Sequence, residues 1–390
     1  MKRVTYIVGI VIVLLFMNIQ TSFAEEEDTL NLGKNAKSSM LIEQDTGMVL
    51  YEKNAHEKLP PASMTKVMTL LLVMEAIENN KLGWDEKITV SEYASSMGGS
   101  QIFLDVGEQM TVEDLVKGIA IASGNDASVA LAERIAGSES AFVAMMNEKV
   151  KQLNLENTKF QNSSGLPAKN HYSSAYDMAM IAKELLKYEK ITKYTAIYED
   201  YLRKGKENEF WLVNTNKLVR FYPEVDGLKT GYTSEAKFCL TATAKKDGMR
   251  VIAVTMGADS AKNRNSIIMD MIHYAFNHYE AEKLFDKGEE LTEIKNLQTE
   301  NLTYDVVTSQ QISVLHKKGE KDTSAPKIDV HVPENYQLPV KKGEQVGTIT
   351  ISKDDDVIHE SPLVLENDME KASLGTLFKR GLFQIVKIKQ

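Results

Sequence analysis

The chain has 390 residues, which is long enough for two or three domains with a sizeable core in at least one of them. Its formal net charge of −9 argues against nucleic acid as a partner, because a nucleic-acid-binding surface needs an excess of lysine and arginine. Cys239 is the only cysteine, so no internal disulfide can form, and the seven histidines are scattered, so no metal site or other cofactor is expected.

The first 24 residues have the layout of a cleaved secretory signal. Two basic residues precede an apolar run over 7–17, and Ser-Phe-Ala at 22–24 offers a cleavage site between small residues. The apolar run is shorter than the ~20 residues that span a bilayer, which disfavours the alternative of a retained membrane anchor. Removal of residues 1–24 would take the formal charge from −9 to −11. The polar residues 25–36 are expected to be a linker.

A hairpin and a buried helix are predicted next. Two apolar stretches within 40–52 flank Asp-Thr-Gly at 45–47, which is typical of a tight turn between strands. The segment PPASMTKVMTLLLVMEAIENN (60–80) starts with two prolines and continues as an apolar run. It predicts a buried helix that begins near Ser63 and ends at the two asparagines.

Further helices and strands alternate up to about residue 284. Residues 111–137 predict two helices separated by Ser-Gly-Asn at 123–125, the second ended by Gly137. Residues 238–258 predict two strands joined by a Lys-Lys-Asp-Gly turn, and 265–280 have helical periodicity.

The last third of the chain has a different character. Residues 285–367 are short β-branched stretches between charged and glycine clusters, which predicts a small β-rich domain. Residues 368–390 are expected to hold an amphipathic helix from 374, because at about 100° per residue its apolar side chains share one face. These are Leu374, Leu377, Phe378, Leu382, Ile385, Val386 and Ile388. Arg380 and Lys387 lie opposite, and we expect this helix to lie in a membrane surface; the alternative is a helix that packs on the β-rich domain.

Ser63 and Lys66 form an S-x-x-K pattern at the predicted helix start. Residues three apart lie on the same face of a helix, so the hydroxyl and the amine can meet. Serine is a poor nucleophile near neutral pH and needs a base, and lysine can be that base only if burial or a second cation lowers its pKa. The apolar run after Lys66 favours burial, and the N–H groups of a helix start would face charge that develops near Ser63. Taken alone, the pattern also fits an exposed lysine on an ordinary helix.

Two later motifs strengthen this interpretation. Ser123-Gly124-Asn125 falls at the predicted helix break, where a hydroxyl and an amide can face a cleft. Lys-Thr-Gly at 229–231 immediately precedes the strand pair, so it can lie on a strand that faces the same cleft. Each motif alone fits ordinary cap or turn residues. The ordered trio S-x-x-K, S-x-N and K-T-G is a strong signal for a serine acyl-enzyme.

With these motifs, the chain resembles the low-molecular-mass penicillin-binding proteins, the D-alanyl-D-alanine carboxypeptidases that trim peptidoglycan stem peptides. The resemblance covers roughly residues 30–370 and includes the segments 171–186, 214–219 and 225–236. It implies an α/β catalytic domain over 37–284, with an antiparallel sheet flanked by helices and a helical cluster, followed by the β-rich domain. Lys237 departs from the small residue usual in the family, but it lies past the catalytic motif.

The resemblance implies roles for the nucleophilic motifs. Ser63 would attack the carbonyl between the two terminal D-alanines, Lys66 would accept its proton, and water would hydrolyse the acyl-enzyme. Ser123 and Asn125 would complete the proton network and hold the peptide. The same serine would be acylated by β-lactams.

The resemblance also implies a substrate-binding strand. Lys229 and Thr230 would bind the terminal carboxylate. Thr233 would either help to hold that carboxylate or only fill space on the strand. Gly231 would leave room for the substrate, and the backbone N–H of Tyr232 would form the oxyanion hole with that of the nucleophile. His171, Asp177 and Cys239 are outside this set: His171 and Asp177 are expected to be structural, and Cys239 a small core residue.

Other functions of the same fold stay open. A β-lactamase would commonly pair Ser-Asp-Asn with a loop glutamate, whereas the second motif here is Ser-Gly-Asn and no glutamate lies between Asn157 and Met180. A peptidoglycan endopeptidase is the nearest active alternative, and a non-catalytic peptidoglycan-binding protein would keep the fold without the chemistry. The predicted location is the outer face of the cytoplasmic membrane, with peripheral attachment through the C-terminal helix.

Overall fold

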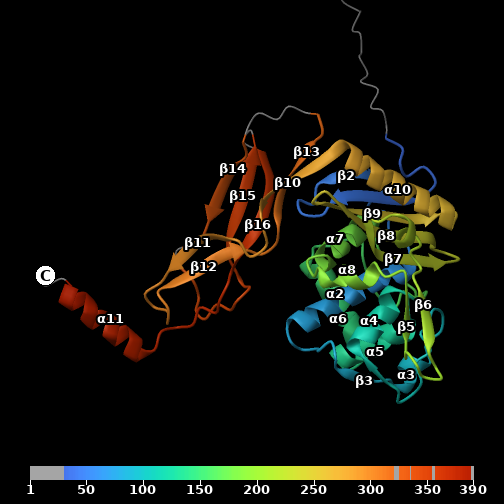
Figure 1. The fold of residues 1–390 in the computed structure, drawn as a ribbon, viewed down its shortest axis with the longest axis horizontal. Helices are drawn as coiled ribbons and strands as arrows, with labels where there is room; N and C mark the ends of the chain where they lie inside the picture. Colours follow the sequence, from blue (N-terminus) through green and yellow to red (C-terminus); the bar gives the residue numbers. More distant parts are fainter. Residues whose placement is uncertain (1–29, 320–324, 334, 354–355, 388–390) are drawn as a thin grey trace, which may run out of the picture. The chain divides into compact units, whose positions relative to one another are not determined.

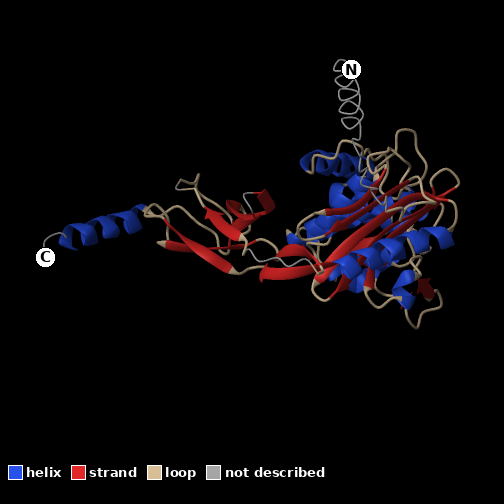
Figure 2. Cartoon of the chain, turned by 90° about the horizontal axis from the view of Figure 1, so that it is seen from above, coloured by secondary structure: helices blue, strands red, loops and turns tan. Residues whose placement is uncertain are grey.

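The computed structural model describes residues 30–319, 325–333, 335–353 and 356–387, and the predicted signal and residues 25–29 of the predicted linker lie outside this part of the chain. The chain divides into two compact units after Leu32, and the helices and strands described below belong to the second unit, which begins at Gly33. Figure 1 shows its elements in chain order and Figure 2 their type.

A five-stranded antiparallel sheet organises the catalytic region. Its strand order is β2-β1-β9-β8-β7, so β1 pairs on one side with β2, its neighbour in the chain, and on the other with β9, about 200 residues later. The strands are β1 (Ser38–Glu43), β2 (Val49–Lys53), β7 (Val225–Thr233), β8 (Lys237–Lys246) and β9 (Met249–Ala258). The central strands are buried because helix α10 (Ala261–His278) packs on β8 and β9, while α7 (Ala175–Leu185) packs on β1 and β9 from the other side (Figure 1).

A helical cluster lies beyond α7, and the helix predicted to start near Ser63 is part of it. A short 3₁₀ turn, η1 (Ala62–Thr65), leads into α2 (Lys66–Glu78), which is buried on nearly all sides because most of its side chains, including all of 70–74, are apolar. The surrounding helices are α4 (Val112–Ala120), α5 (Asn125–Ala136), α6 (Glu139–Gln152) and α8 (Lys190–Thr195). The smaller elements are β3 (Lys87–Thr89), α3 (Glu92–Ser95), β4 (Gln109–Thr111), β5 (Glu199–Leu202), β6 (Phe210–Val213) and α9 (Leu218–Phe221).

Most predicted elements of this region are confirmed. The 40–52 hairpin is β1 and β2, with Gly47 at φ +76° in the turn. The helix break at 123–125 separates α4 from α5, and Gly137 ends α5 in the left-handed conformation. The α-helix after the prolines begins at Lys66 rather than at Ser63, because the first turn is 3₁₀.

The last third of the unit, from β10 onwards, is β-rich. A five-stranded antiparallel sheet has the order β11-β12-β16-β15-β14, and β10 pairs with β13. These strands are β10 (Tyr279–Phe285), β11 (Glu290–Lys295), β12 (Thr303–Thr308), β13 (Ile312–Lys317), β14 (Lys327–His331), β15 (Gln345–Lys353) and β16 (Asp356–Leu365). Their inward side chains form a core separate from that of the catalytic region.

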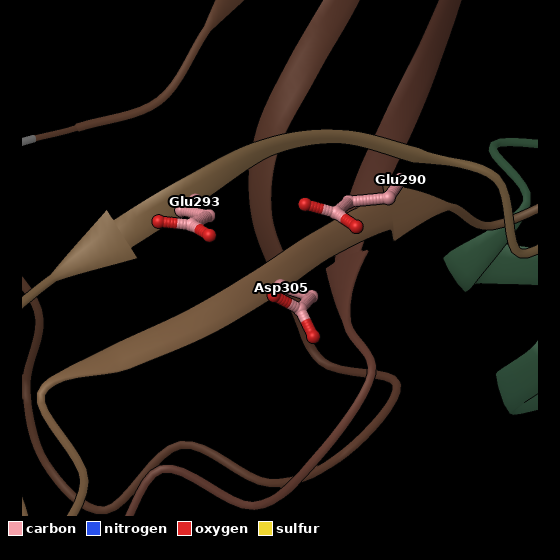
Figure 3. Close-up of side chains that lie close together, drawn as sticks. All are labelled: Glu290, Glu293 and Asp305. Atoms are coloured by element: carbon pink, nitrogen blue, oxygen red, sulfur yellow. The ribbon is translucent and has the colours of Figure 1, made fainter.

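One acidic group stands out on this sheet. Glu290, Glu293 and Asp305 lie on the paired strands β11 and β12, with carboxylate oxygens within 4.8 Å of one another (Figure 3). Both glutamates are exposed and the aspartate is half-buried. Acidic groups of this kind are common on protein surfaces, and we assign no function to this one.

Helix α11 (Leu374–Lys387) follows the β-rich domain, as the amphipathic pattern predicts. The hydroxyl of Ser373 accepts a hydrogen bond from the N–H of Thr376 at 3.1 Å, which caps the start of the helix. Among the described residues, no helix combines the length and the apolar character needed to cross a bilayer.

Candidate active site

The predicted nucleophile and base meet at the η1–α2 junction. Ser63 lies in η1, half-buried, and Lys66 is the first residue of α2 and completely buried. Lys66 Nζ is 3.1 Å from Ser63 Oγ, 2.6 Å from Asn125 Oδ1 and 2.6 Å from the carbonyl oxygen of Ser164. The amine is therefore held by two carbonyl-type acceptors and faces the serine hydroxyl.

The surroundings of Lys66 favour its neutral form. Burial lowers the pKa of Lys66 well below its ordinary value of 10.5, and the ammonium of Lys229 lowers it further. The carboxylate of Asp126 acts in the opposite direction but less strongly. A neutral amine has two N–H donors and one lone pair. The two short contacts to Asn125 and Ser164 use both donors, which leaves the lone pair for the hydroxyl of Ser63.

The second motif supplies one of these acceptors. Asn125 begins α5, and its amide is fixed from the other end because Nδ2 donates to the carbonyl of Gly98 at 2.6 Å. Ser123 is buried in the left-handed conformation at φ +66°. Within the described residues, the hydrogen bonds join Lys66 to Asn125 and not to the hydroxyl of Ser123. The carboxylate of Asp126 accepts from the N–H groups of Ile102 and Leu104 and so ties the 98–104 loop to α5.

The third motif lies on β7, against η1. A Cβ on Gly231 would lie 2.6 Å from the carbonyl oxygen of Pro61, so only glycine allows this close approach of strand and turn. Lys229 is buried and donates to the carbonyl of Thr230 at 3.1 Å. Burial lowers the pKa of Lys229 to about 7, and the nearby guanidinium of Arg264 acts in the same direction. The site thus holds buried positive charge without a carboxylate beside Lys229, which suits an anionic ligand.

The remaining predicted residues continue along the same strand. Thr230 donates a hydrogen bond from its hydroxyl to Thr215 Oγ1 at 2.8 Å. Tyr232 is exposed, and its ring lies 4.5 Å from that of Phe238. Thr233 is half-buried, and its hydroxyl accepts from the N–H of Ala236 at 3.0 Å, which closes the turn to β8.

Several contributors to the site were not predicted from the sequence. The carbonyls of Ser164 and Gly98 act through the backbone, so no residue type marks them. Thr215 lies in the 214–219 segment, and its position in that segment was the only signal for it. Arg264 is buried on α10, and its guanidinium bonds only to the side chain of Asn265 among the described residues. It lies in the polar stretch 261–266, just before the predicted helix 265–280, so no signal in the sequence marked it.

The residues expected to be structural are built into the packing. His171 Nδ1 accepts from the N–H of Gln161 at 3.1 Å, so Nε2 carries the proton and donates to Thr65 Oγ1 at 2.8 Å. Asp177 accepts from the N–H of Asn157 and from the hydroxyl of Thr158. Cys239 is buried, and burial raises the pKa of its thiol to about 11, so it stays protonated near neutral pH.

These features are those expected of a serine enzyme that works through a covalent acyl intermediate: a buried lysine faces the serine hydroxyl, and a strand with a second buried lysine lies opposite. The comparisons with known proteins agree. A family model described as D-alanyl-D-alanine carboxypeptidase matches residues 23–260, and one described as the C-terminal domain of penicillin-binding protein 5 matches residues 279–371. The chain belongs to this carboxypeptidase family, and it is a serine-type D-alanyl-D-alanine carboxypeptidase with the two-domain fold that the sequence predicted.

Individual relatives cover nearly the whole chain. The chain is 50% identical to the D-alanyl-D-alanine carboxypeptidase DacF of Bacillus subtilis over 393 aligned positions, which span 100% of both chains. Penicillin-binding protein 5 of Haemophilus influenzae has a similar structure, with a TM-score of 0.66, 31% identity and coverage of 86% of this chain and 98% of that one. The cefotaxime-bound penicillin-binding protein D2 of Listeria monocytogenes matches 62% of this chain and 97% of its own, at 31% identity and a TM-score of 0.57.

Proposed function

We propose that Ser63 is the nucleophile and Lys66 its base in the release of the terminal D-alanine from peptidoglycan stem pentapeptides. The observation that carries this assignment is the position of Lys66 Nζ, 3.1 Å from Ser63 Oγ and 2.6 Å from each of two carbonyl-type acceptors, which would take both N–H donors of a neutral amine and leave its lone pair for the hydroxyl. The bond from Oγ to the carbonyl carbon forms as the proton passes to Nζ. The C–N bond then breaks, the departing D-alanine amine takes that proton, and water hydrolyses the ester.

The opposite wall of the site would bind the end of the substrate. Lys229 and Thr230 would hold the terminal carboxylate, and the positive charge of Arg264 adds to the attraction. The N–H groups of Ser63 and Tyr232 would stabilise the oxyanion, with Gly231 allowing the strand to approach η1. Ser123 and Asn125 would carry the proton from Lys66 towards the leaving amine and hold the peptide.

The test is to compare penicillin labelling and D-alanine release in single and double variants. Ser63→Ala should abolish both, and Lys66→Ala should slow acylation by about a thousandfold or more. Because both residues serve one covalent step, the double variant should be little worse than the worse single variant. Lys81→Ala, at an exposed lysine, is the control. Strictly additive losses, or covalent labelling of Ser63→Ala, would contradict the assignment.

We also propose that the protein is secreted and attaches peripherally to the outer face of the cytoplasmic membrane. The layout of residues 1–24 supports secretion, although that segment lies outside the described residues. Attachment is supported by α11, on which Leu374 is 87% exposed and Phe378 is 68% exposed. The 374–390 segment has no acidic residue, which suits a surface of anionic lipids. Peripheral attachment would keep the active site close to newly made peptidoglycan.

A further inference from the structure

One carboxylate outside the acyl-transfer machinery contacts the loop that holds Lys66. Glu139 is the first residue of α6 and is half-buried. Its Oε1 accepts two hydrogen bonds from Ser163, at 2.9 Å from the N–H and at 2.6 Å from the hydroxyl. Ser163 is completely buried, and within the described residues Glu139 is the only acceptor for these two donors. Removal of the carboxylate would therefore leave two buried donors without a partner.

Ser163 directly precedes the residue that holds the base. The carbonyl of Ser164 accepts from Lys66 Nζ at 2.6 Å. The carbonyl of Ser163 accepts from the hydroxyl of Thr69, three residues further along α2, also at 2.6 Å. Two consecutive carbonyls of the loop thus contact one face of α2. A shift of Ser163 would therefore displace the carbonyl that holds Lys66.

The other oxygen of Glu139 contacts a second segment of the site. Tyr93, on α3, donates its hydroxyl to Glu139 Oε2 at 2.7 Å. Five residues further along the chain, the carbonyl of Gly98 holds Nδ2 of Asn125. The Oδ1 atom of Asn125 is the other acceptor of Lys66. One carboxylate thus contacts both segments that hold the amine.

The two contacts differ in importance. The segment of Tyr93 has a further anchor, because the hydroxyl of Ser91 donates to a carboxylate oxygen of Glu133 at 2.6 Å. Neither donor of Ser163 has a second acceptor in the part of the chain that the structure describes. The position of the Ser164 carbonyl therefore depends more on Glu139 than the position of α3 does.

We propose that Glu139 is a positioning residue for acyl transfer: through Ser163 it fixes the loop carbonyl that directs the amine of Lys66. The inference rests on the proposed roles of Ser63 and Lys66 and adds a carboxylate that bonds to neither. A loop displaced by about 1 Å would leave the amine misdirected, and misplacement on that scale costs about a hundredfold in a positioned reaction. Glu139 lines a surface cavity of about 430 Å³, so a smaller side chain there leaves no void in the core.

The experiment measures the second-order rate of penicillin acylation in variants of the full chain. Glu139→Ala removes both acceptors and should slow acylation by about ten- to a hundredfold. Glu139→Gln should restore most of the rate, because its amide oxygen can still accept from Ser163. Tyr93→Phe removes only the contact to α3 and should have a much smaller effect. Glu148→Ala, at an exposed position on the same helix, is the matched control and should leave the rate unchanged.

The pH profile separates a displaced carbonyl from a general loss of stability. A carbonyl stabilises an ammonium group more than an amine, so loss of the Ser164 contact should lower the pKa of Lys66 further. The acid limb of the acylation rate should therefore move to lower pH in Glu139→Ala. The charged groups that act on this pKa are Lys229 and Asp126, so Glu139→Gln should leave the limb in place. A protein that is only less stable would show a smaller labelled fraction and an unmoved limb.

Several results would overturn the positioning role and leave the carboxypeptidase function intact. They are an unchanged rate in folded Glu139→Ala, a slower rate with an unmoved limb, and an equal loss in Glu139→Gln, which would trace the effect to the charge. Circular dichroism establishes folding. Should Glu139→Ala fail to fold, Ser163→Ala removes the hydroxyl contact alone; it should slow acylation and move the limb in the same direction, and no change in either would overturn the role. Penicillin labelling that persists in Ser63→Ala would contradict the proposed function itself, and the inference would fall with it.

Discussion

Lys66 and Lys229 are two buried lysines in one site, and the charge of Lys229 lowers the pKa of Lys66. Each lysine is anchored by carbonyl-type oxygens rather than by a carboxylate. A carboxylate beside Lys66 Nζ would hold its proton and remove its basicity. The neutral acceptors around Lys66 are therefore consistent with the role of base that we propose for it.

Removing the charge of Lys229 should move the pH dependence of acylation. Lys66 must be neutral to accept the proton, so the rate of penicillin acylation should fall as the pH drops through the pKa of Lys66. In Lys229→Met the pKa of Lys66 loses one lowering influence and rises, so the acid limb should move to higher pH. The measurement is the second-order acylation rate from about pH 5 to pH 10.

The prediction concerns the pH at which the acylation rate falls, and not the maximum rate, because Lys229→Met is also expected to weaken binding of the substrate. Lys81→Met should leave the limb in place. An acid limb that stays at the same pH in Lys229→Met would show that the two ammonium groups do not interact in the way the geometry indicates.

The same variant should change the stability of the protein with a defined sign. The folded-state pKa of Lys229 is about 7, below its ordinary value of 10.5, so the folded chain disfavours the charged form. Below pH 7 the lysine is charged in both states and the full cost is present; the cost disappears as the pH rises towards 10.5. Lys229→Met should therefore raise the free energy of unfolding by roughly 5 kcal/mol at pH 6 and by about 2 kcal/mol at pH 9. Urea unfolding at both pH values measures it, and an equal gain at both would contradict the assigned pKa.

At the scale of elements, the approach of β7 to η1 sets the distance between the binding strand and the nucleophile. In Gly231→Ala the new Cβ would lie 2.6 Å from the carbonyl oxygen of Pro61 and 3.2 Å from the backbone nitrogen of Met64. Backbone atoms cannot yield as a flexible side chain can, so the strand must move away from the turn. A displacement near 1 Å costs about a hundredfold in a positioned reaction.

We expect Gly231→Ala to fold and to be acylated by penicillin about a hundredfold more slowly. Gly83→Ala is the control, because the nearest atom to its new Cβ is 3.8 Å away. Circular dichroism and thermal unfolding establish that the variant is folded, and the labelling rate gives the effect. Wild-type labelling kinetics in a folded Gly231→Ala protein would mean that this approach does not position the reaction.

The sequence predicted elements better than it predicted the contacts between them. The helix break at 123–125 and the turn between β8 and β9 follow from local rules, because Gly and Asn mark where the chain changes direction. The three motifs were predicted to converge from their order, and the structure supplies the distances. The carbonyls of Ser164 and Gly98 could not be predicted, since every residue has a carbonyl and only the folded chain selects one.

At the scale of the whole molecule, the 297–300 loop fixes how α11 leaves the β-rich domain. The carboxylate of Glu300 accepts from the N–H of Ser373 at 3.0 Å and from the hydroxyl of Thr376 at 2.9 Å, at the positive end of the helix. The guanidinium of Arg380 donates to the carbonyls of Leu297, Thr299 and Glu300 at 3.0, 2.6 and 2.6 Å. Because 373, 376 and 380 share one face, the loop covers the polar side of the helix.

Two apolar side chains at the start of α11 stay uncovered in this arrangement. Leu374 and Phe378 are four residues apart, share a face and are among the most exposed large apolar side chains of the described residues. If α11 packed its apolar face on the β-rich domain, these two side chains would be buried. Both are exposed, which disfavours that alternative. With the polar side held by the loop, the helix would meet a membrane with its apolar side while the β-rich domain stays in water.

The final prediction is that truncation after Ala372 releases the protein from membranes without loss of its chemistry. Burial of about six apolar side chains at roughly 1.5–3 kcal/mol each exceeds the ordering cost of the helix, which is enough for peripheral attachment. Leu374→Ser combined with Phe378→Ser should weaken attachment in the full chain, whereas Val357→Ser, at an exposed position on β16, should not. Cell fractionation and penicillin labelling measure location and activity together. If the truncated protein still sediments with membranes as completely as the full chain, α11 is not the anchor, and a retained segment at 1–24 becomes the better explanation.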